Sequence, residues 1–373
     1  MLLRRYRLSP RTRLVASAQE RFLVCDHPLQ WIRLNETAWQ LLRALDGDGY
    51  LHERVSGVTP EAVDYLESLT ERGVLKADYR LRWPEEWPLV RVIVPAYGDP
   101  HRLRNCLESL GRLDYPAERF AVTVVDDGSP EPLEQALGSD RGDWGDMGLG
   151  GRLRWQRLER NRGPADARNA AALAEPAAPA ESADTLLAFV DSDCEVAPDW
   201  LRQLAAVLEE PSLAAAGGRV TGMGGHSLLA RYEGACSSLD MGSRPGRVGV
   251  RGAPVPYLPS CNLAVRAGAF RRAGGFAAAW RTGEDVDFCW RLVAGGERLF
   301  YWPEAAVAHD HRERWGPFLA RKRDYGRSEG PLGARHPARF AVGGPGWLFR
   351  GALIAAGAAL WSGSGWAAGA TLA

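Results

Sequence analysis

Alternation between short apolar runs and helical repeats begins at residue 89, and it constrains the fold of this chain more than any other feature. The runs that predict strands are 89–94, 120–125, 154–158 and 186–190, and the segments with helical spacing include 103–110 and 165–173. Strands joined by helices form mostly parallel sheets with helices on both faces. We therefore predict an α/β fold with a doubly wound, mostly parallel sheet, in which ligands bind beyond the carboxyl ends of the strands.

The first 82 residues have a different pattern, which predicts a small α+β domain of winged-helix-like character. Segments 21–25 and 30–34 alternate like strands, and Asn35 and Thr59 have the residue types of helix N-caps just before helical repeats. The expected parts of the chain are this domain at 1–82, a Trp- and Pro-rich linker at 83–88, the α/β domain at 89–311 and a C-terminal part at 312–373.

Charge and cysteine content exclude several classes of protein. The 46 basic and 46 acidic side chains balance, which excludes a nucleic-acid binder that works through overall charge. The six cysteines form no C-x-x-C pair, which excludes zinc ribbons and thiol redox motifs and predicts reduced core cysteines. No signal peptide is recognisable at the start of the chain, and we expect a cytoplasmic location.

Carboxylates follow two of the predicted strands, at Asp191-Ser192-Asp193 and at Asp126-Asp127. Because parallel strands end at one edge of a sheet, both pairs are expected to face one crevice. Two carboxylates two residues apart suit a hard divalent cation, whose shell also accepts diphosphate oxygens. An acid on the neighbouring strand suits the N–H of a nucleotide base. Each segment alone also fits an ordinary polar turn.

Two more positions along the chain have the residue types of a reactive site. Glu284 and Asp285 stand just before a predicted helix, where a carboxylate suits a general base and an acidic helix cap is the alternative. His309 follows a late apolar run, and its imidazole can bind Mn²⁺. His311 competes for that role, and an ordinary surface histidine is the third interpretation.

In this order, the motifs resemble those of the family-two glycosyltransferases, which have the GT-A fold. The resemblance extends from about residue 89 to residue 310. It rests on P-A-Y at 95–97, D-D-G-S at 126–129, N-x-G at 161–163, A-R-N at 167–169, D-x-D at 191–193, S-C-N-L-A-V-R at 260–266, G-G-F at 274–276 and G-E-D-V-D-F at 283–288. Each motif is weak by itself, whereas the ordered set is specific.

The resemblance implies inverting transfer of a sugar from a nucleotide-diphosphate sugar to an acceptor hydroxyl, with Mn²⁺ or Mg²⁺ as cofactor. UDP-sugars are favoured as donors, and UDP-glucose is one candidate. The donor-binding residues that it implies are Pro95, Ala96, Tyr97, Asp126, Asp127, Asn161, Gly163, Arg168, Asp191 and Ser192. The implied metal ligands are Asp193, Asp191 and His309, the catalytic residues Asp285 and Glu284, and the acceptor-side residues Asn262, Asp287 and Arg291.

Individual roles also follow from the resemblance. Asp127 is expected to hold the base, with Tyr97 packed on it, and Asp193 to ligate the metal directly. Asp191 is expected to face ribose or a metal-bound water, and Asp285 to be the general base. The Gln-x-x-Arg-Trp motif of processive members is absent from 319–326, which favours addition of one or a few sugars.

The first domain resembles the small peptide-recognition domains of ribosomal-peptide modification systems, through its strand pair, L-N-E-T-A at 34–38 and D-G-D-G at 46–49. Joined to such a transferase, it resembles the glycosyltransferases of mycofactocin systems. This implies a peptide or peptide-derived redox cofactor as acceptor, and we expect the strand at 21–25 to pair with an extended peptide at its edge. A wing that only packs on the transferase through Trp31 and Trp39 is the alternative.

Other functions remain open from the sequence. One is transfer to a lipid or a cell-envelope glycan, and another is a peptide-binding adaptor with a degenerate transferase domain, against which Asp127, Asp193 and Asp285 argue. A nucleotidyltransferase or a dinucleotide dehydrogenase would need a glycine-rich loop after the first strand, where the chain has P-A-Y-G-D-P.

The last part of the chain combines a basic segment at 312–350 with an uncharged one at 351–373. Twenty-three uncharged residues are long enough to span a bilayer, although Gly and Ala weaken the signal. A basic segment before an apolar one fits the cytoplasmic face of a membrane. We therefore expect membrane association here, and a chain that lacks later spans is the alternative.

Overall fold

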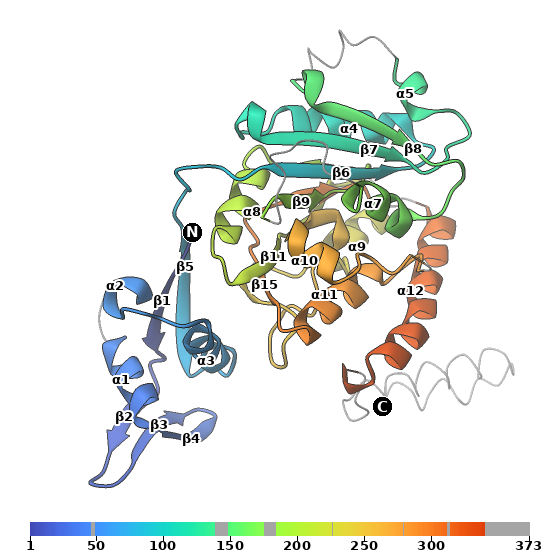
Figure 1. The fold of residues 1–373 in the computed structure, drawn as a ribbon. Helices are drawn as coiled ribbons and strands as arrows, with labels where there is room; N and C mark the ends of the chain where they lie inside the picture. The colour runs from blue at the N-terminus through green and yellow to red at the C-terminus, as the bar shows by residue number, and fades with distance from the viewer. Residues whose placement is uncertain are drawn as a thin grey trace, which may run out of the picture. The chain divides into compact units, whose positions relative to one another are not determined.

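The computed structural model describes residues 1–45, 49–138, 148–174, 184–225, 227–278, 280–311 and 314–339 (Figure 1). The chain divides into two units, Met1–Tyr325 and Gly326–Ala373. The finer division at residues 82, 88 and 311 stays a prediction. Within the described residues no helix is long and apolar enough to cross a membrane. The uncharged segment at 351–373 lies outside the described residues, as do positions 46–48 of the D-G-D-G motif.

The N-terminal elements form two antiparallel sheets and three helices. They are β1 (Leu2–Leu8), β2 (Thr12–Ala16), β3 (Arg21–Asp26), β4 (Leu29–Leu34), α1 (Glu36–Ala44), α2 (Leu51–Arg54), α3 (Pro60–Glu71) and β5 (Leu75–Leu81). The predicted caps are present, since Asn35 accepts the N–H of Ala38 at 2.8 Å and Thr59 that of Ala62 at 3.3 Å. One sheet pairs β1 with β5, and the other has the order β2-β3-β4.

This order corrects one expectation. The segment at 21–25 lies in β3, which pairs with β2 on one side and β4 on the other. Both of its edges are therefore occupied, and the prediction of an open edge there is wrong. Alternation of apolar and polar residues does not distinguish a central strand from an edge strand, because both have the same period of two.

The second set of elements begins at β6. It comprises β6 (Val90–Ala96), α4 (Pro100–Gly111), β7 (Phe120–Asp126), α5 (Leu133–Ala136), β8 (Leu153–Arg157), α7 (Pro164–Ala172), β9 (Leu186–Phe189), β10 (Cys194–Val196), α8 (Trp200–Leu208), β11 (Leu213–Gly217), β12 (Val220–Gly222), α9 (Leu228–Cys236), β13 (Gly246–Arg247), β14 (Leu263–Arg266), α10 (Ala267–Arg272), α11 (Glu284–Ala294), β15 (Arg298–Tyr301), β16 (Val307–His309) and α12 (Trp315–Arg335). Short 3-10 helices occur at Ala117–Arg119, Gly150–Arg152, Ser260–Asn262 and Pro337–Arg339.

These elements build an eight-stranded sheet in the order β13-β15-β11-β14-β9-β6-β7-β8. The pairs β9-β6, β6-β7, β7-β8 and β11-β15 are parallel, and β14 and β13 run against the other strands. Along β6, Val92 and Val94 face a core that includes α4 and α8, whereas Ile93 faces one that includes α7, α10 and α11. Burial on both faces explains the continuous apolar run. The predicted α/β class with a mostly parallel sheet is confirmed.

A small second sheet, β10-β16-β12, lies after the D-x-D motif and positions its last acid. β10 pairs with β16 so that Cys194 is opposite His309. Asp193 precedes β10 directly and its carbonyl accepts the N–H of Asp310 at 2.9 Å. Residues more than a hundred positions apart in the sequence therefore come into contact.

Ion pairs join the N-terminal elements to the second set of elements, at β15 and at the loop between α8 and β11. The buried Arg4 of β1 lies 2.5 Å from Glu210, and Arg298 of β15 lies 2.8 Å from Asp64 of α3. Trp31, by contrast, is 62% exposed and packs edge-on against Phe22 of its own sheet. Trp39, the other tryptophan predicted to make this contact, packs against the core of the N-terminal elements. Contact with the second set of elements thus involves β1, α3 and Tyr79 of β5, whose ring packs edge-on against Phe300 of β15.

Candidate active site

The two acids at the end of β7 are both held by protein groups. Asp126 accepts the N–H groups of Ser129 and Leu133 at 2.9 and 3.1 Å and pairs with Arg157. Burial opposes ionisation of Asp126, but the hydrogen bonds to Ser129 and the others outweigh it, so its pKa is lowered. Asp126 therefore closes the turn after β7. Gly128 is required there, because a Cβ atom would lie 2.5 Å from the backbone of Arg160.

Asp127 ties β7 to the loop before α7. Its two carboxylate oxygens accept the N–H groups of Arg162 and Gly163, each at 2.8 Å. Gly163 has a φ of 97°, a backbone conformation that favours glycine. Burial raises the pKa of Asp127, and the two N–H donors oppose the rise. Its role in holding a base stays a prediction.

The remaining donor-side residues of the first strands lie around the same sheet edge. Pro95 and Ala96 are buried at the end of β6, where they pair with Val125 and Asp126 of β7. Tyr97 follows and is 52% exposed, so its ring is accessible to a ligand. Asn161 is exposed in the loop before α7.

Arg168 joins the D-x-D motif to the acids of α11. It is 1% exposed, and its guanidinium donates to Asp191 at 2.5 Å and to Glu284 at 3.0 Å. Burial alone would lower the pKa of Arg168, but Asp191 and Glu284 raise it above its ordinary value. Arg168, which was predicted to bind the donor, thus links two other predicted site residues. Ser192 lies between the two D-x-D acids and is partly exposed.

Asp285 follows Glu284, which Arg168 links to Asp191, and the pKa of Asp285 is raised. Burial, and then the charge of Glu284, raise its pKa to about 7. The N–H groups of Ser260 and Val286, at 3.2 and 2.8 Å, and the charge of Arg168 limit the rise. A carboxyl group with a pKa close to neutral pH is suited to general acid–base chemistry. The N-terminus of α11, which starts after Gly283, also favours the negative charges there.

Asp193 and His309 form a second cluster, which has the donor atoms of a metal site. The Oδ2 atom of Asp193 lies 3.5 Å from Nε2 of His309, and these two side chains and the Cys194 thiol lie within 4.8 Å of one another. Nδ1 of His309 is buried and has no hydrogen-bond partner among the described residues. Burial, followed by its hydrogen bond to Cys261, raises the pKa of Cys194 well above the usual range. A protonated thiol does not suit Mn²⁺ or Mg²⁺, whereas a carboxylate and an imidazole do.

The three residues predicted on the acceptor side are engaged within the protein. Asn262 is fully buried, accepts from Trp200 at 2.8 Å and donates to the carbonyls of Arg219 and Ala305 at 3.0 and 2.8 Å. Asp287 pairs with Arg291 at 2.8 Å. The Arg291 guanidinium also donates to the carbonyls that flank Gly274. These contacts give all three residues a structural role, and their contact with an acceptor stays a prediction.

One residue near the site was missed from the sequence. Arg321 of α12 lies over the ring of Tyr325, at 5.0 Å from its centre, and its Nε atom is buried without a hydrogen-bond partner among the described residues. Burial alone would lower its pKa, but the nearby Tyr325, Glu284 and Asp191 raise it. The spacing of four between Arg321 and Tyr325 was the available signal, since it places both on one face of a helix.

Comparisons with known proteins agree with these motifs. The model of glycosyl transferase family 2 matches residues 91–274, and that of glycosyl transferase family group 2 matches residues 186–369. The pre-mycofactocin glycosyltransferase of Mycobacterium tuberculosis is 36% identical over 271 residues, which are 70% of this chain and 53% of that protein. An N-acetylglucosaminyltransferase of Mesorhizobium japonicum is 34% identical over 137 residues, 36% of this chain and 29% of that protein.

Among solved structures, S. aureus TarS 1-349 in complex with UDP-GlcNAc has a TM-score of 0.47 and 23% identity, with 61% of this chain and 59% of that chain covered. The chain spans about half the length of the mycobacterial relative. Its ordered motifs and the two overlapping family matches define its class. The chain belongs to family 2 of the glycosyltransferases.

Proposed function

We propose that this chain transfers a sugar from a nucleotide-diphosphate sugar, with inversion, to a hydroxyl group of a peptide-derived acceptor. The observation that carries the proposal is the bridge from Asp191 through Arg168 to Glu284. It brings the D-x-D motif and the candidate base Asp285 to one place, as a single-displacement reaction requires. Nucleic acid is not part of the proposal.

The donor end of the reaction is assigned to Asp193 and His309. Their carboxylate and imidazole fit Mn²⁺ in donor type, and the buried Nδ1 atom of His309 has no hydrogen-bond partner among the described residues. When bound, the ion would neutralise the diphosphate leaving group. Asp127 and the exposed Tyr97 are assigned to the nucleotide base. Each Asp127 oxygen accepts one backbone N–H and keeps a second lone pair for an N–H of the base, while the Tyr97 ring offers a surface for stacking.

The acceptor end is assigned to Asp285. In its ionised form the carboxylate takes the proton of the acceptor hydroxyl while that oxygen attacks the anomeric carbon, and the bond to the diphosphate breaks. Arg168 holds Glu284 in an ion pair, so the negative charge beside Asp285 is partly neutralised. A single attack by the acceptor oxygen, on the face of the anomeric carbon opposite the diphosphate, accounts for inversion without a covalent intermediate on the protein.

A peptide-derived acceptor, such as a mycofactocin-type redox cofactor precursor, is favoured over a lipid or a glycan. The support is the mycobacterial relative, described as a pre-mycofactocin glycosyltransferase, together with the additional N-terminal elements β1 to β5. UDP-sugars are the favoured donors, with UDP-glucose the first to try.

A donor screen tests the enzymatic part. Purified full chain is incubated with single nucleotide sugars, with and without Mn²⁺, and released nucleotide diphosphate is measured. We expect release that depends on the divalent ion and is lost in Asp193→Asn, but retained in the control Glu195→Gln, an acid on β10 outside the metal-site cluster. Equal release by Asp193→Asn and the parent would remove the metal assignment. No release with any donor would contradict the transferase proposal.

A further inference from the structure

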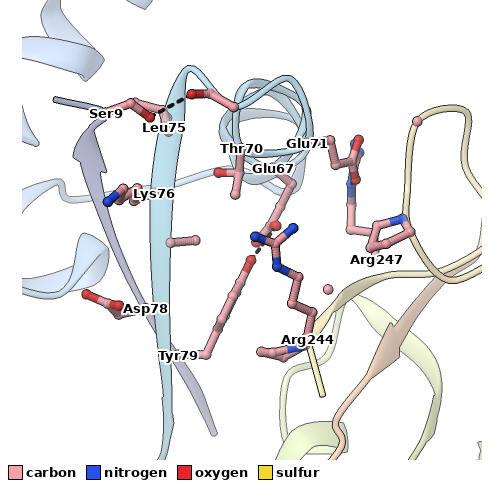
Figure 2. Close-up of a pocket in the computed structure, with 16 residues that line it drawn as sticks. Ser9, Glu67, Thr70, Glu71, Leu75, Lys76, Asp78, Tyr79, Arg244 and Arg247 are labelled. Atoms are coloured by element: carbon pink, nitrogen blue, oxygen red, sulfur yellow. Dashed lines mark hydrogen bonds and ion pairs between the residues drawn. The ribbon is translucent and has the colours of Figure 1, made fainter. Parts of the chain in front are cut away.

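A cleft of about 520 Å³ lies between β5 and the loop at residues 244–254, away from the cluster around Arg168. Figure 2 shows its two walls: β5 and α3 on one side, with Tyr79, Glu67 and Glu71, and Arg244 and Arg247 on the other. None of the residues assigned to sugar transfer lines it. The cleft therefore needs a separate explanation.

Both walls include an outer strand of a sheet. β5 has β1 as its one strand partner among the described residues, and β13, which contributes Gly246 and Arg247, is the outermost strand of the large sheet. In an antiparallel pair, alternate residues direct their N–H and C=O groups away from the partner. The bond from Ser9 N to Val74 O, at 3.0 Å, sets this alternation. It leaves the backbone groups of Leu75, Ala77 and Tyr79 directed away from β1, and all three residues line the cleft.

The charged side chains of the cleft differ in whether they have a partner. Glu67 accepts from Tyr6 and Tyr79 at 2.5 and 2.7 Å, and Glu71 pairs with Arg247 at 2.7 Å. Arg244 is exposed and makes no hydrogen bond or ion pair with any residue in the part of the chain that the structure describes. Among the described residues, the cleft thus combines the outward-directed backbone groups of a strand edge with the unpaired guanidinium of Arg244.

We infer that this cleft binds an extended peptide segment, which adds to the free edge of β5 and places a carboxylate on Arg244. Edge addition supplies backbone hydrogen bonds and needs few special side chains. The edge from residue 75 to residue 79 accommodates a segment of about five residues, at about 3.4 Å per residue. The inference rests on the proposed peptide-derived acceptor and names the place where its peptide part is held.

Binding can be tested without any donor sugar. A displayed library of random decapeptides is selected on the full chain, and enriched peptides are resynthesised with a fluorescent label for anisotropy. We expect enriched peptides to contain Asp or Glu. Arg244→Glu should weaken their binding about tenfold or more, because it removes a charge-assisted hydrogen bond. The matched control is Arg80→Glu, an exposed arginine of β5 outside the cleft, with unchanged binding.

A second variant tests the strand edge. Ala77→Pro removes an N–H that is directed away from β1, so the β1-β5 pairing is kept while peptide addition is blocked. Lack of enrichment, or binders that ignore both Arg244→Glu and Ala77→Pro, would overturn the inference. Failure of the transferase proposal is distinguishable, because it appears as absent release of nucleotide diphosphate while peptides still bind in the cleft.

Discussion

Replacing Asp285 with asparagine should make the protein more stable at alkaline pH while it abolishes transfer. The side chain has a pKa of about 7 in the folded protein, because it is buried beside Glu284. The usual value for aspartate in an unfolded chain is about 3.9. A folded pKa above the unfolded one means that folding favours the proton, so this group's contribution to stability is complete below pH 4 and is lost as the pH rises to 7.

The size of the effect follows from the two pKa values. Each pH unit between them is worth about 1.4 kcal/mol, so the ionised Asp285 lowers the free energy of unfolding by about 4 kcal/mol at pH 8. Asparagine is neutral throughout and avoids this loss. The stability advantage of Asp285→Asn should therefore grow by about 3 kcal/mol between pH 5 and pH 8.

Urea unfolding of the parent and of Asp285→Asn, followed at intervals from pH 5 to pH 8.5, measures this difference. Asp114→Asn is the control, because Asp114 is 66% exposed and its replacement should give a difference that is nearly constant with pH. Transfer by the parent should fall about tenfold for each pH unit below 7, since the base becomes protonated. A stability difference that stays flat from pH 5 to pH 8.5 would refute the raised pKa, and transfer by Asp285→Asn at the parent rate would refute the role of base.

Three further changes test other residues of the site. Arg168→Met leaves Asp191 and Glu284 without their shared cation, and calorimetry should show that the free energy of unfolding falls by about 3–5 kcal/mol. A fall of less than about 1 kcal/mol would contradict a bridging role. Asp126→Asn should cost about 1–3 kcal/mol at pH 7. Because the pKa of Asp126 is lowered by folding, this cost should shrink as the pH falls below the usual aspartate value of about 3.9 and through the lowered folded one. A cost that does not change with pH over that range would argue against this. Arg321→Met should raise the KM for the nucleotide sugar and leave the melting temperature unchanged. A lower melting temperature with an unchanged KM would indicate that Arg321 only packs in the fold.

Local features of the fold could be predicted, and features that depend on distant residues could not. The caps Asn35 and Thr59 act on N–H groups three residues away, so local sequence is sufficient to recognise them. β1 was missed, because its buried Arg4 interrupts the apolar pattern. Burial of Arg4 is possible because it pairs with Glu67 and Glu210, which lie more than sixty and more than two hundred positions away in the sequence.

The same distinction applies to the candidate site. Acids after apolar strands indicated where the site lies, because strand ends in a parallel sheet converge. The motif did not indicate that Asp127 would be occupied by backbone N–H groups, or that Asn262 would be enclosed by three partners. Residue type and spacing identify which groups can do chemistry, while the tertiary contacts decide which of them are free to do it.

The contacts of the N-terminal elements also decide how their role should be tested. Arg4 is buried against both Glu67 of α3 and Glu210 next to α8, and Arg298 of β15 pairs with Asp64. Deletion of 1–82 would leave Glu210 and Arg298 without their partners and expose apolar surface around β15, so lost activity after deletion would not separate recruitment from stability. A substitution in the cleft of the full chain, such as Arg244→Glu, leaves those ion pairs in place. It should change acceptor binding and leave β10 and α11, the elements at which Asp193 and Asp285 lie, in place, and it therefore separates the two explanations.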